Sequence, residues 1–357
     1  MEPGSLGSAL LSALETEKIS REIITWYAAA RRELPWRMTP SPYHTWIAEI
    51  MLQQTRIEAV IPYYERFLAE LPDIPALAAV SEERLLKLWE GLGYYSRARN
   101  LRRAAQILTE RYGGELPASA EELRKLPGIG DYTAGAIASI AFGLPEPAVD
   151  GNVLRVMTRV LACGDDIMQE ATRKRIRDLL RTVYPSGEGA GLLTEGLMEL
   201  GETVCLPNAL PRCELCPLKE DCLARCRGEE QRYPIRSEKK ARRVEEKTVL
   251  LFRHAGRYAI RKRPETGLLA GLWEFPTADG AFLPDAGVFL GQSKHIFTHV
   301  EWQMKAYRID CAEESPDYTW RTPEEITRDF SLPTAFRKFQ KLLLAEAGDR
   351  QHPGTGI

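Results

Sequence analysis

Hydrophobic side chains recur at helical spacing along the first 200 residues of the chain. They return every three or four positions, without the alternation that predicts strands. Prolines and glycines fall between these stretches, where helices begin and end. The pattern predicts a wholly helical region, with helices over Ile19–Ala30, Thr45–Phe67, Ser81–Trp89, Ser96–Arg111 and Ala171–Val183.

The pattern changes after residue 228. Residues 229–246 are rich in charge and poor in hydrophobic side chains, and we interpret them as a linker. Beyond them, Thr248–His254 and Arg257–Arg263 flank a short turn and predict a hairpin. His295–Asp310 alternates like a second pair of strands, and Pro333–Ala347 is typical of a helix.

These patterns predict a chain of two domains. The first is all-α and covers residues 1–228, and the second is α+β and covers residues 247–357. The tail from Gly348 is expected to be frayed. The length of 357 residues also favours two domains over one.

Composition narrows the class of protein only slightly. Hydrophobic residues make up 44% and charged residues 27%, which is an ordinary globular balance. The net charge is −2, whereas a nucleic-acid binder usually carries a basic domain. Residues 1–228 contribute −4 and the remainder contributes +2. Any contact with DNA must therefore come from local geometry.

Nothing in the sequence indicates a membrane or secreted protein. No hydrophobic run approaches the roughly 18 residues that a span requires. Ala9–Leu14 is short, lacks a basic flank and is followed by glutamates, so it does not resemble a signal peptide. We expect a cytoplasmic protein in a reducing setting.

A glycine-containing turn between two predicted helices is the first motif that indicates a binding function. It reads Leu126-Pro-Gly-Ile-Gly130, followed by Asp-Tyr-Thr-Ala at the start of an alanine-rich helix over Tyr132–Phe142. Such a helix-hairpin-helix presents backbone N–H groups and a helix N-terminus to a phosphate. Gly-x-Gly alone also suits an ordinary turn between helices, but the longer string is more specific.

Two carboxylic acids are candidates for catalysis. Glu49 is the single charge in an otherwise hydrophobic helical stretch, so burial would raise its pKa and suit it to general-acid work. Asp150 lies 20 residues after Gly130, and one intervening helix can return it to the hairpin. There it can stabilise a sugar cation. The plainer interpretations are a solvent-facing Glu49 and an Asp150 that only caps a helix.

Five of the seven cysteines lie within one short stretch of the chain. Cys205-x7-Cys213-x2-Cys216-x5-Cys222 has the density of a metal site, either zinc or a [4Fe–4S] cluster. Only one pair is closely spaced, which favours iron–sulfur over structural zinc. Cys226 is a fifth candidate, and the set Cys213, Cys216, Cys222 and Cys226 is an alternative.

The order of these motifs resembles that of the helix-hairpin-helix DNA glycosylases that carry an iron–sulfur cluster. Within this superfamily the chain is similar to the MutY family, which removes adenine mispaired with 8-oxoguanine. The resemblance runs from about Ile19 to Phe339. It implies a [4Fe–4S] cluster in a loop over residues 205–226, held by Cys205, Cys213, Cys216 and Cys222. It also implies a monovalent or divalent cation at the hairpin.

The resemblance implies three groups of site residues. The catalytic group is Glu49, Asp150, Asn152 and Tyr132. The pocket for flipped adenine is Arg32, Trp36, Arg37, Leu52 and Glu195. The contacts to DNA and to 8-oxoguanine are Gln54, Thr55, Leu92, Tyr94, Gly128, Gly130, Phe297, Thr298 and His299.

Two features separate the chain from endonuclease III, which carries a lysine nucleophile in the hairpin. The matching residue here is Tyr132, which cannot form an imine. The chain also continues into a region that is similar to a MutT/Nudix-like domain, through Gly267–Pro276 and Phe297–His299. The glutamate-rich metal-binding helix of Nudix hydrolases is missing after Pro276. We interpret this domain as a reader of 8-oxoguanine.

The chain departs from the MutY pattern in three places. The first cysteine gap is x7 where x6 is usual, Thr298 stands where serine is usual, and Cys226 has no assigned role. We expect a monomeric base-excision repair enzyme that hydrolyses the N-glycosidic bond of adenine opposite 8-oxoguanine or G in double-stranded DNA. The alternatives are an endonuclease III-type lyase, a non-catalytic DNA-binding iron–sulfur protein and a nucleotide hydrolase.

Overall fold

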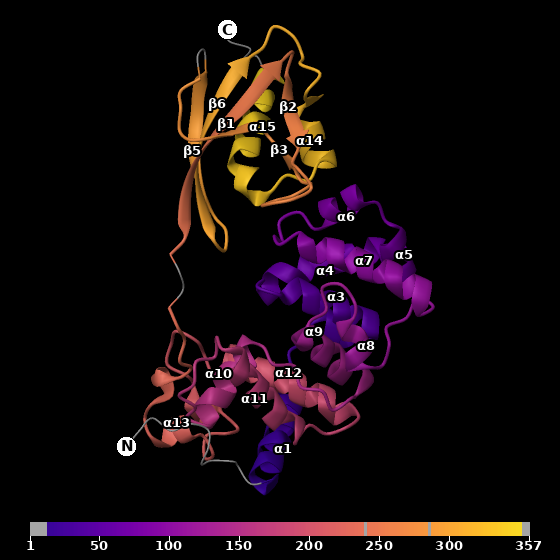
Figure 1. Cartoon of the computed structure of the whole chain (residues 1–357), viewed down its shortest axis with the longest axis vertical. Helices are drawn as coiled ribbons and strands as arrows, with labels where there is room; N and C mark the ends of the chain where they lie inside the picture. Colours follow the sequence, from indigo (N-terminus) through magenta and orange to yellow (C-terminus); the bar gives the residue numbers. More distant parts are fainter. Residues whose placement is uncertain (1–12, 239–240, 285–286, 352–357) are drawn as a thin grey trace, which may run out of the picture. The chain divides into compact units, whose positions relative to one another are not determined.

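The computed structural model describes residues 13–238, 241–284 and 287–351. The chain divides into two compact units. One unit consists of Met1–Ala79 and Asn100–Glu238, and the other of Val80–Arg99 and Lys239–Ile357. An all-α region is followed by an α+β region, as the sequence predicts (Figure 1). The stretch Ala9–Leu14, which does not resemble a signal peptide in sequence, lies mostly outside the described residues.

The first unit is helical throughout. Its helices are α1 (Ala13–Ala30), α2 (Pro35–Met38), α3 (Pro42–Leu52), α4 (Ile57–Glu70), α5 (Ile74–Ala79), most of α7 (Ser96–Arg111), α8 (Ala120–Arg124), α9 (Asp131–Ala136), α10 (Gly151–Val160), α11 (Glu170–Arg181), α12 (Glu188–Thr203) and α13 (Leu223–Cys226). Short 3-10 turns occupy Cys213–Leu215 and Glu230–Arg232. Helices α1, α10, α11 and α12 share a hydrophobic core that includes Ile23, Val156, Ile176 and Leu197.

Two predicted helices are interrupted. The stretch Thr45–Phe67 is not one helix, because α3 ends at Leu52 and Gln54 has a φ of 58° in the polar turn before α4. Pro62 does not mark a boundary and lies inside α4, where it forgoes one backbone hydrogen bond. The alanine-rich helix ends at Ala136 and continues as a π-helical turn, Ile137–Ala141. Such turns occur often near functional sites.

The second unit is built on a seven-stranded sheet of order β3-β2-β1-β6-β5, with β4 and β7 paired to β1 and β2. The strands are β1 (Arg243–His254), β2 (Arg257–Lys262), β3 (Trp273–Glu274), β4 (Thr277–Asp279), β5 (Val288–Ile296), β6 (Val300–Asp310) and β7 (Thr319–Arg321). The predicted hairpin joins β1 to β2, and β1 also runs parallel to β6. Because β1 begins at Arg243, the last residues of the predicted linker are already strand.

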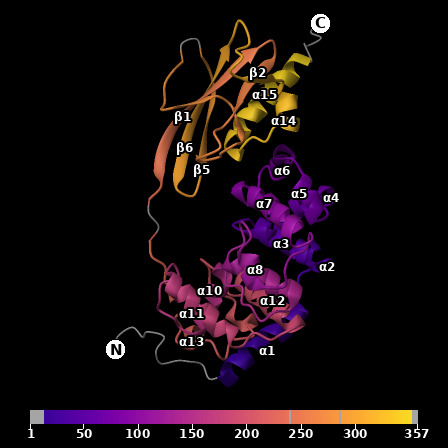
Figure 2. The ribbon, with the colours of Figure 1, turned by 45° about the vertical axis from the view of Figure 1, so that its right-hand side comes forward.

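Helices cover one face of this sheet. They are α14 (Pro323–Asp329) and α15 (Arg337–Gln351), which lie on the same side of the strands in both views (Figures 1 and 2). Phe336, Phe339 and Leu343 pack there against Val249 and Leu251. The predicted frayed tail is helical as far as Gln351, and the residues after it lie outside the described ranges.

Residues 80–99 belong to the same unit as this sheet. They include α6 (Glu82–Leu88), and Lys87 Nζ donates to the carbonyls of Thr327 at 2.6 Å and Phe330 at 3.0 Å. The Glu90 carboxylate accepts the Leu332 N–H at 2.9 Å. A segment from the middle of the helical region thus packs with residues more than 200 positions later. Within the described ranges, no helix combines the length and hydrophobicity that crossing a bilayer requires.

Candidate active site

The glycine turn joins α8 to α9, as the hairpin motif predicts. Gly128 has a φ of +80°, and a Cβ there would lie 2.8 Å from the Cβ of Asn100. Ile129 is buried and anchors the turn, whereas Gly130 is exposed and precedes the first turn of α9. The turn therefore holds a helix N-terminus open to solvent, where an anion can approach the backbone N–H groups.

A cavity of about 110 Å³ lies beside the hairpin in the first unit. It brings together side chains from α2, α3, α9, α10 and α12. Its lining is Leu34, Trp36, Arg37, Glu49, Leu52, Thr55, Ile57, Tyr132, Asp150, Asn152, Glu195, Met198, Glu199 and Glu202. All four predicted catalytic residues are in this set. Arg32 and Gln54 are not part of the lining.

Glu49 is buried, contrary to the solvent-facing alternative. Its side chain lies on α3, and Glu49 is 6% exposed. The Tyr132 hydroxyl donates to Glu49 Oε2 at 2.5 Å. Burial raises the pKa of Glu49 to about 7, an effect that the Tyr132 hydrogen bond opposes and the nearby Asp150 and Glu195 increase. Glu49 is thus able to carry and release a proton near neutral pH.

Asp150 caps α10 and also faces the cavity. Its Oδ1 accepts the Val153 N–H at 2.8 Å, and its Oδ2 accepts from Asn152 Nδ2 at 2.9 Å. Burial raises the pKa of Asp150, whereas these two hydrogen bonds lower it. The plain capping role and the position at the cavity are therefore compatible, because the N-terminus of α10 favours the ionised carboxylate.

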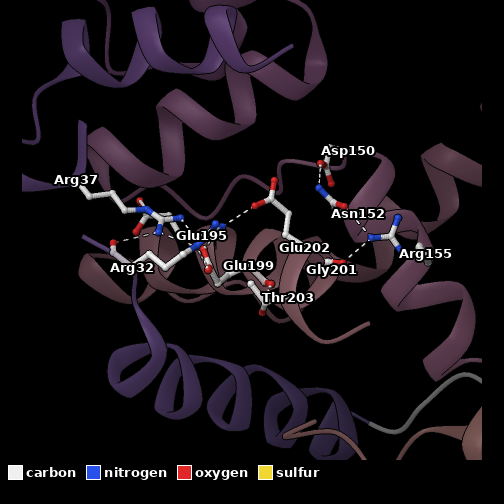
Figure 3. Close-up of polar contacts among 10 residues, drawn as sticks. All are labelled: Arg32, Arg37, Asp150, Asn152, Arg155, Glu195, Glu199, Gly201, Glu202 and Thr203. Atoms are coloured by element: carbon white, nitrogen blue, oxygen red, sulfur yellow. Dashed lines mark hydrogen bonds and ion pairs between the residues drawn. The ribbon is translucent and has the colours of Figure 1, made fainter. Parts of the chain in front are cut away.

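Asn152 is held in turn by Arg155. The Arg155 guanidinium donates to Asn152 Oδ1 at 2.8 Å and to the Gly201 carbonyl at 2.7 Å (Figure 3). It also donates to the Cys205 carbonyl at 2.8 Å. Arg155 is 4% exposed. This chain of contacts fixes the orientation of the Asn152 amide and, through it, of the Asp150 carboxylate.

A row of three glutamates on α12 lines another side of the cavity. Glu195, Glu199 and Glu202 share one helix face at i, i+4 and i+7 spacing. The Glu199 carboxylate pairs with both Arg32 and Arg37, and Arg37 Nη2 lies 3.1 Å from Glu199 Oε2 (Figure 3). Arg32 also pairs with Glu202. The sequence analysis missed Glu199 and Glu202, although this spacing from Glu195 was visible in the sequence.

The four predicted cluster cysteines line a second cavity in the first unit. Cys205, Cys213, Cys216 and Cys222 surround it, and Cys226 does not. Arg159 Nη1 donates to Cys205 Sγ at 3.2 Å. In the described ranges, no three His, Cys, Asp or Glu side chains lie close enough together to hold one metal ion.

The predicted residues on the 8-oxoguanine side fall in both units. Gln54 and Thr55 lie in the turn after α3. In the second unit, Leu92 is buried and Tyr94 is 46% exposed with a φ of 48°. The hydroxyls of Tyr94 and Thr298 lie 3.0 Å apart.

The loop between β5 and β6 presents its residues unequally. Phe297 packs against the core of the sheet and contacts the Trp302 ring at a centroid distance of 5.0 Å. Thr298 and His299 are exposed. The loop can therefore offer two polar side chains to a partner while Phe297 anchors it.

Comparison with known proteins places these sites in a family. Residues 47–182 match the HhH-GPD superfamily of base excision DNA repair proteins, and residues 248–342 match the NUDIX domain. The chain is 32% identical to the adenine DNA glycosylase of Rattus norvegicus over 89% of this chain and 76% of that protein. The chain belongs to the adenine DNA glycosylase family. Its Glu49, Tyr132 and Asp150 all fall within the matched HhH-GPD segment.

Solved structures agree with this fold. A thermostable thymine-DNA glycosylase is 27% identical, with a TM-score of 0.54 over 60% of this chain and 99% of that one. A trapped endonuclease III–DNA covalent intermediate is also 27% identical, with a TM-score of 0.52 over 62% of this chain and 99% of that one. This adenine DNA glycosylase therefore combines a helix-hairpin-helix glycosylase fold with a C-terminal Nudix-like domain.

Proposed function

We propose that this glycosylase hydrolyses the N-glycosidic bond of adenine paired with 8-oxoguanine or G and leaves an abasic site. The observation that carries the proposal is the meeting of Glu49, Tyr132 and Asp150 at one cavity beside the hairpin. Two carboxyl groups with different surroundings can serve as acid and as anionic stabiliser in the same site. The hairpin would hold the DNA backbone while the adenine enters the cavity.

Glu49 is the proposed general acid. With a pKa of about 7 it is substantially protonated at neutral pH. Transfer of that proton to N7 of the flipped adenine makes the base a better leaving group. The hydroxyl of Tyr132 holds the Glu49 carboxyl in place at 2.5 Å.

Asp150 is the proposed stabiliser of the sugar cation. Its carboxylate is fixed by the Val153 N–H and by Asn152, whose own amide is fixed by Arg155. A negative charge held in a partly dry cavity interacts strongly with a developing oxocarbenium ion. The base leaves with the proton from Glu49. Water then adds to the sugar carbon from which the base departed, and it gives up a proton to the Glu49 carboxylate, which restores the acid.

Tyr132 is the reason for proposing a monofunctional enzyme. A lyase of the endonuclease III type needs an amine at this position of the hairpin to form an imine with the sugar. The phenol of Tyr132 cannot form one, and burial raises its pKa well above the ordinary value, so it remains a neutral donor.

The second unit is proposed to read the lesion. Tyr94 and Thr298 meet through their hydroxyls, so a base inserted beside Tyr94 would face the exposed end of the β5–β6 loop. Leu92, Phe297 and His299 complete this proposed reader, whereas Gln54 and Thr55 are proposed to act from the first unit.

The residues around the second cavity fit a [4Fe–4S] cluster. Four thiols surround one space that the buried Arg159 also lines, and the buried Arg155 donates to the carbonyl of Cys205. Within the described part of the chain, these two arginines pair with backbone carbonyls, Asn152 and a sulfur rather than with a carboxylate. An anionic cluster would balance their charge. When bound, it would cross-link the loop of residues 205–222 and supply a redox-active group.

Single-turnover base release on defined duplexes tests the proposed reaction. The substrates contain A opposite 8-oxoguanine, A opposite G, or thymine glycol. We expect free adenine from the first two, and an intact abasic strand that breaks only after alkali. Glu49→Gln should slow release about 10²–10⁴-fold, the usual contribution of a general acid.

Three results would favour another function. Release from thymine glycol alone, or borohydride trapping of a covalent adduct, would indicate the endonuclease III-type lyase. Base release by Glu49→Gln and Asp150→Asn equal to that of the wild type would indicate a site that is not catalytic. Turnover of 8-oxo-dGTP without adenine release would indicate a nucleotide hydrolase.

A further inference from the structure

Tyr27 lies beside the active-site cavity without lining it. It is on α1, is 0% exposed and contacts α12 at Gly196. A Cβ at Gly196 would lie 2.8 Å from Ile23 Cγ2 and 3.1 Å from Tyr27 Cβ. The absence of a side chain at Gly196 is therefore what lets α1 approach α12 this closely. The approach sets Tyr27 next to Glu195, the residue before Gly196.

The Tyr27 hydroxyl donates to Glu195 Oε2 at 2.9 Å in a buried contact. Arg31 Nη2 lies 3.5 Å from the same oxygen, and Arg37 Nε lies 3.3 Å from Oε1. The Arg37 guanidinium also stands 5.5 Å from the centre of the Tyr27 ring. Both oxygens of Glu195 thus have positively polarised partners, and Tyr27 packs against one of the two arginines.

These contacts hold the Glu195 carboxyl group in one orientation, because Tyr27 and Arg31 face Oε2 and Arg37 faces Oε1. Burial and the neighbouring Glu195 raise the pKa of the Tyr27 phenol, so Tyr27 stays a donor. Glu195 and Glu49 line the same cavity, where Glu195 offers oriented acceptor oxygens and Glu49, with its raised pKa, can present a proton.

One donor and one acceptor complement the edge of adenine. Adenine carries the N7 acceptor beside the N6 amino donor, whereas guanine carries two acceptors, N7 and O6. A protonated Glu49 at N7 leaves the oriented oxygens of Glu195 for the amino group. Guanine in the same position would set its O6 against a carboxylate, at a cost in binding.

We propose that Tyr27 is a positioning residue that sets the selectivity for adenine, by holding the Glu195 carboxylate as acceptor for the exocyclic amino group. This inference rests on the proposed function, because it assumes that adenine is the base in the cavity. Tyr27 touches no reacting atom and acts only through Glu195.

The test is Tyr27→Phe, assayed on two bases opposite 8-oxoguanine. One duplex carries adenine, and the other carries unsubstituted purine, which keeps N7 and lacks the amino group. For adenine we expect single-turnover release to slow about tenfold, as the loss of a hydrogen bond to a charged group implies. For purine we expect a change of less than about twofold, because it makes no amino contact to lose.

Tyr43→Phe is the matched control. The Tyr43 hydroxyl is also buried and donates at 2.8 Å, but its acceptor is the Leu71 carbonyl. It should leave the ratio of adenine to purine release unchanged. Arg31→Met is a second variant, since Arg31 faces the same carboxylate from a more exposed position. It should lower the ratio in the same direction even if Tyr27→Phe folds poorly.

The outcomes separate the inference from the proposed function. An equal slowing of both bases by Tyr27→Phe, or an unchanged ratio in both Tyr27→Phe and Arg31→Met, overturns the positioning role while leaving adenine excision intact. Failure of the wild-type protein to release adenine overturns the proposed function and this inference together. A ratio that falls in Tyr27→Phe and not in Tyr43→Phe supports the role of Tyr27.

Discussion

At the scale of the residue, the surroundings of each acid decide what it can do. Glu49 has a hydrophobic helix around it and one hydroxyl donor, so burial dominates and its pKa rises to about 7. Asp150 receives a backbone N–H and an amide at the start of α10, which oppose the effect of burial. The two carboxyl groups therefore have different hydrogen-bond partners although both line one cavity.

The raised pKa of Glu49 predicts the pH dependence of catalysis. Because Glu49 must carry its proton to act as an acid, single-turnover adenine release should fall as the pH rises through about 7. The measurement is the release rate between about pH 5 and about pH 9 on A opposite 8-oxoguanine. In Glu49→Gln the residual rate should lose this fall. A rate that climbs steadily with pH in the wild type contradicts the assignment.

The same shift has a consequence for stability. The folded protein keeps the Glu49 proton between the ordinary pKa of 4.5 and about 7, and the unfolded chain does not. The contribution of Glu49 to the free energy of unfolding therefore falls as the pH rises across that window. Glu49→Gln removes this contribution, so the variant should gain stability relative to the wild type above neutral pH.

At the scale of the element, the approach of α10 to α12 positions the proposed catalytic residues Asp150 and Asn152. A Cβ at Gly201 would lie 2.5 Å from the Cβ of Asn152 and 3.1 Å from its Cα. The Gly201 carbonyl also accepts a hydrogen bond from Arg155, which orients Asn152. A glycine in the middle of a helix is costly for helix stability, and here it allows the close packing that the site requires.

Gly201→Ala should slow base release strongly and lower the free energy of unfolding only modestly. Displacement of Asn152 by a fraction of an ångström to one ångström should reduce the rate about 10–100-fold. Overpacking costs about 1–3 kcal/mol, and the better helix propensity of alanine offsets about 1 kcal/mol of it. Single-turnover release and thermal unfolding measure the two effects. Gly164→Ala, where a Cβ meets open space, is the control, and a wild-type rate in Gly201→Ala contradicts the argument.

At the scale of the whole molecule, a chain with a net charge of −2 is proposed to bind a polyanion. An acidic chain can still bind DNA, because many charged side chains of the first unit form ion pairs with one another, as Arg32 and Arg37 do with Glu199. The proposed DNA contacts instead use backbone N–H groups at an exposed hairpin, which the net charge does not include.

The cysteine loop joins distant parts of the first unit, because it returns to α10 and α12 after the last long helix of the unit.

Serine variants of Cys205 and Cys226 test the ligand set at this scale. Cys205 lines the shared cavity and receives a hydrogen bond from Arg159, whereas Cys226 is exposed outside it. Cys205→Ser should lower the iron content and the thermal stability of the whole chain, because cluster binding is coupled to folding. Cys226→Ser should change neither. Iron loss in Cys226→Ser, with full iron in Cys205→Ser, would favour the alternative set.

Local patterns in the sequence predicted most of the elements but not their interruptions. Hydrophobic spacing located α6, α7 and α11 within a few residues, and turn signals located the β1–β2 hairpin. It also located the end of α1, which begins at Ala13 rather than at the predicted Ile19. The break after Leu52 and the π-helical turn at Ile137–Ala141 were not predicted, since hydrophobic spacing continues through both. Gly135 illustrates the reason, because a Cβ there would lie 2.4 Å from the Pro147 carbonyl oxygen, a contact that no local pattern reveals.

By itself, the sequence predicted the helical first region, the later strands and several helix bounds, because helical period, caps and turns depend on neighbours along the chain. It also supplied the hairpin, the two acids and the four thiols as candidates. Only the tertiary structure decided that Glu49, Tyr132 and Asp150 share a cavity, that Tyr27 holds Glu195, and that residues 80–99 pack with the C-terminal sheet. These facts join residues from about 80 to more than 200 positions apart. Their proximity depends on side-chain packing between elements, which sequence spacing does not encode.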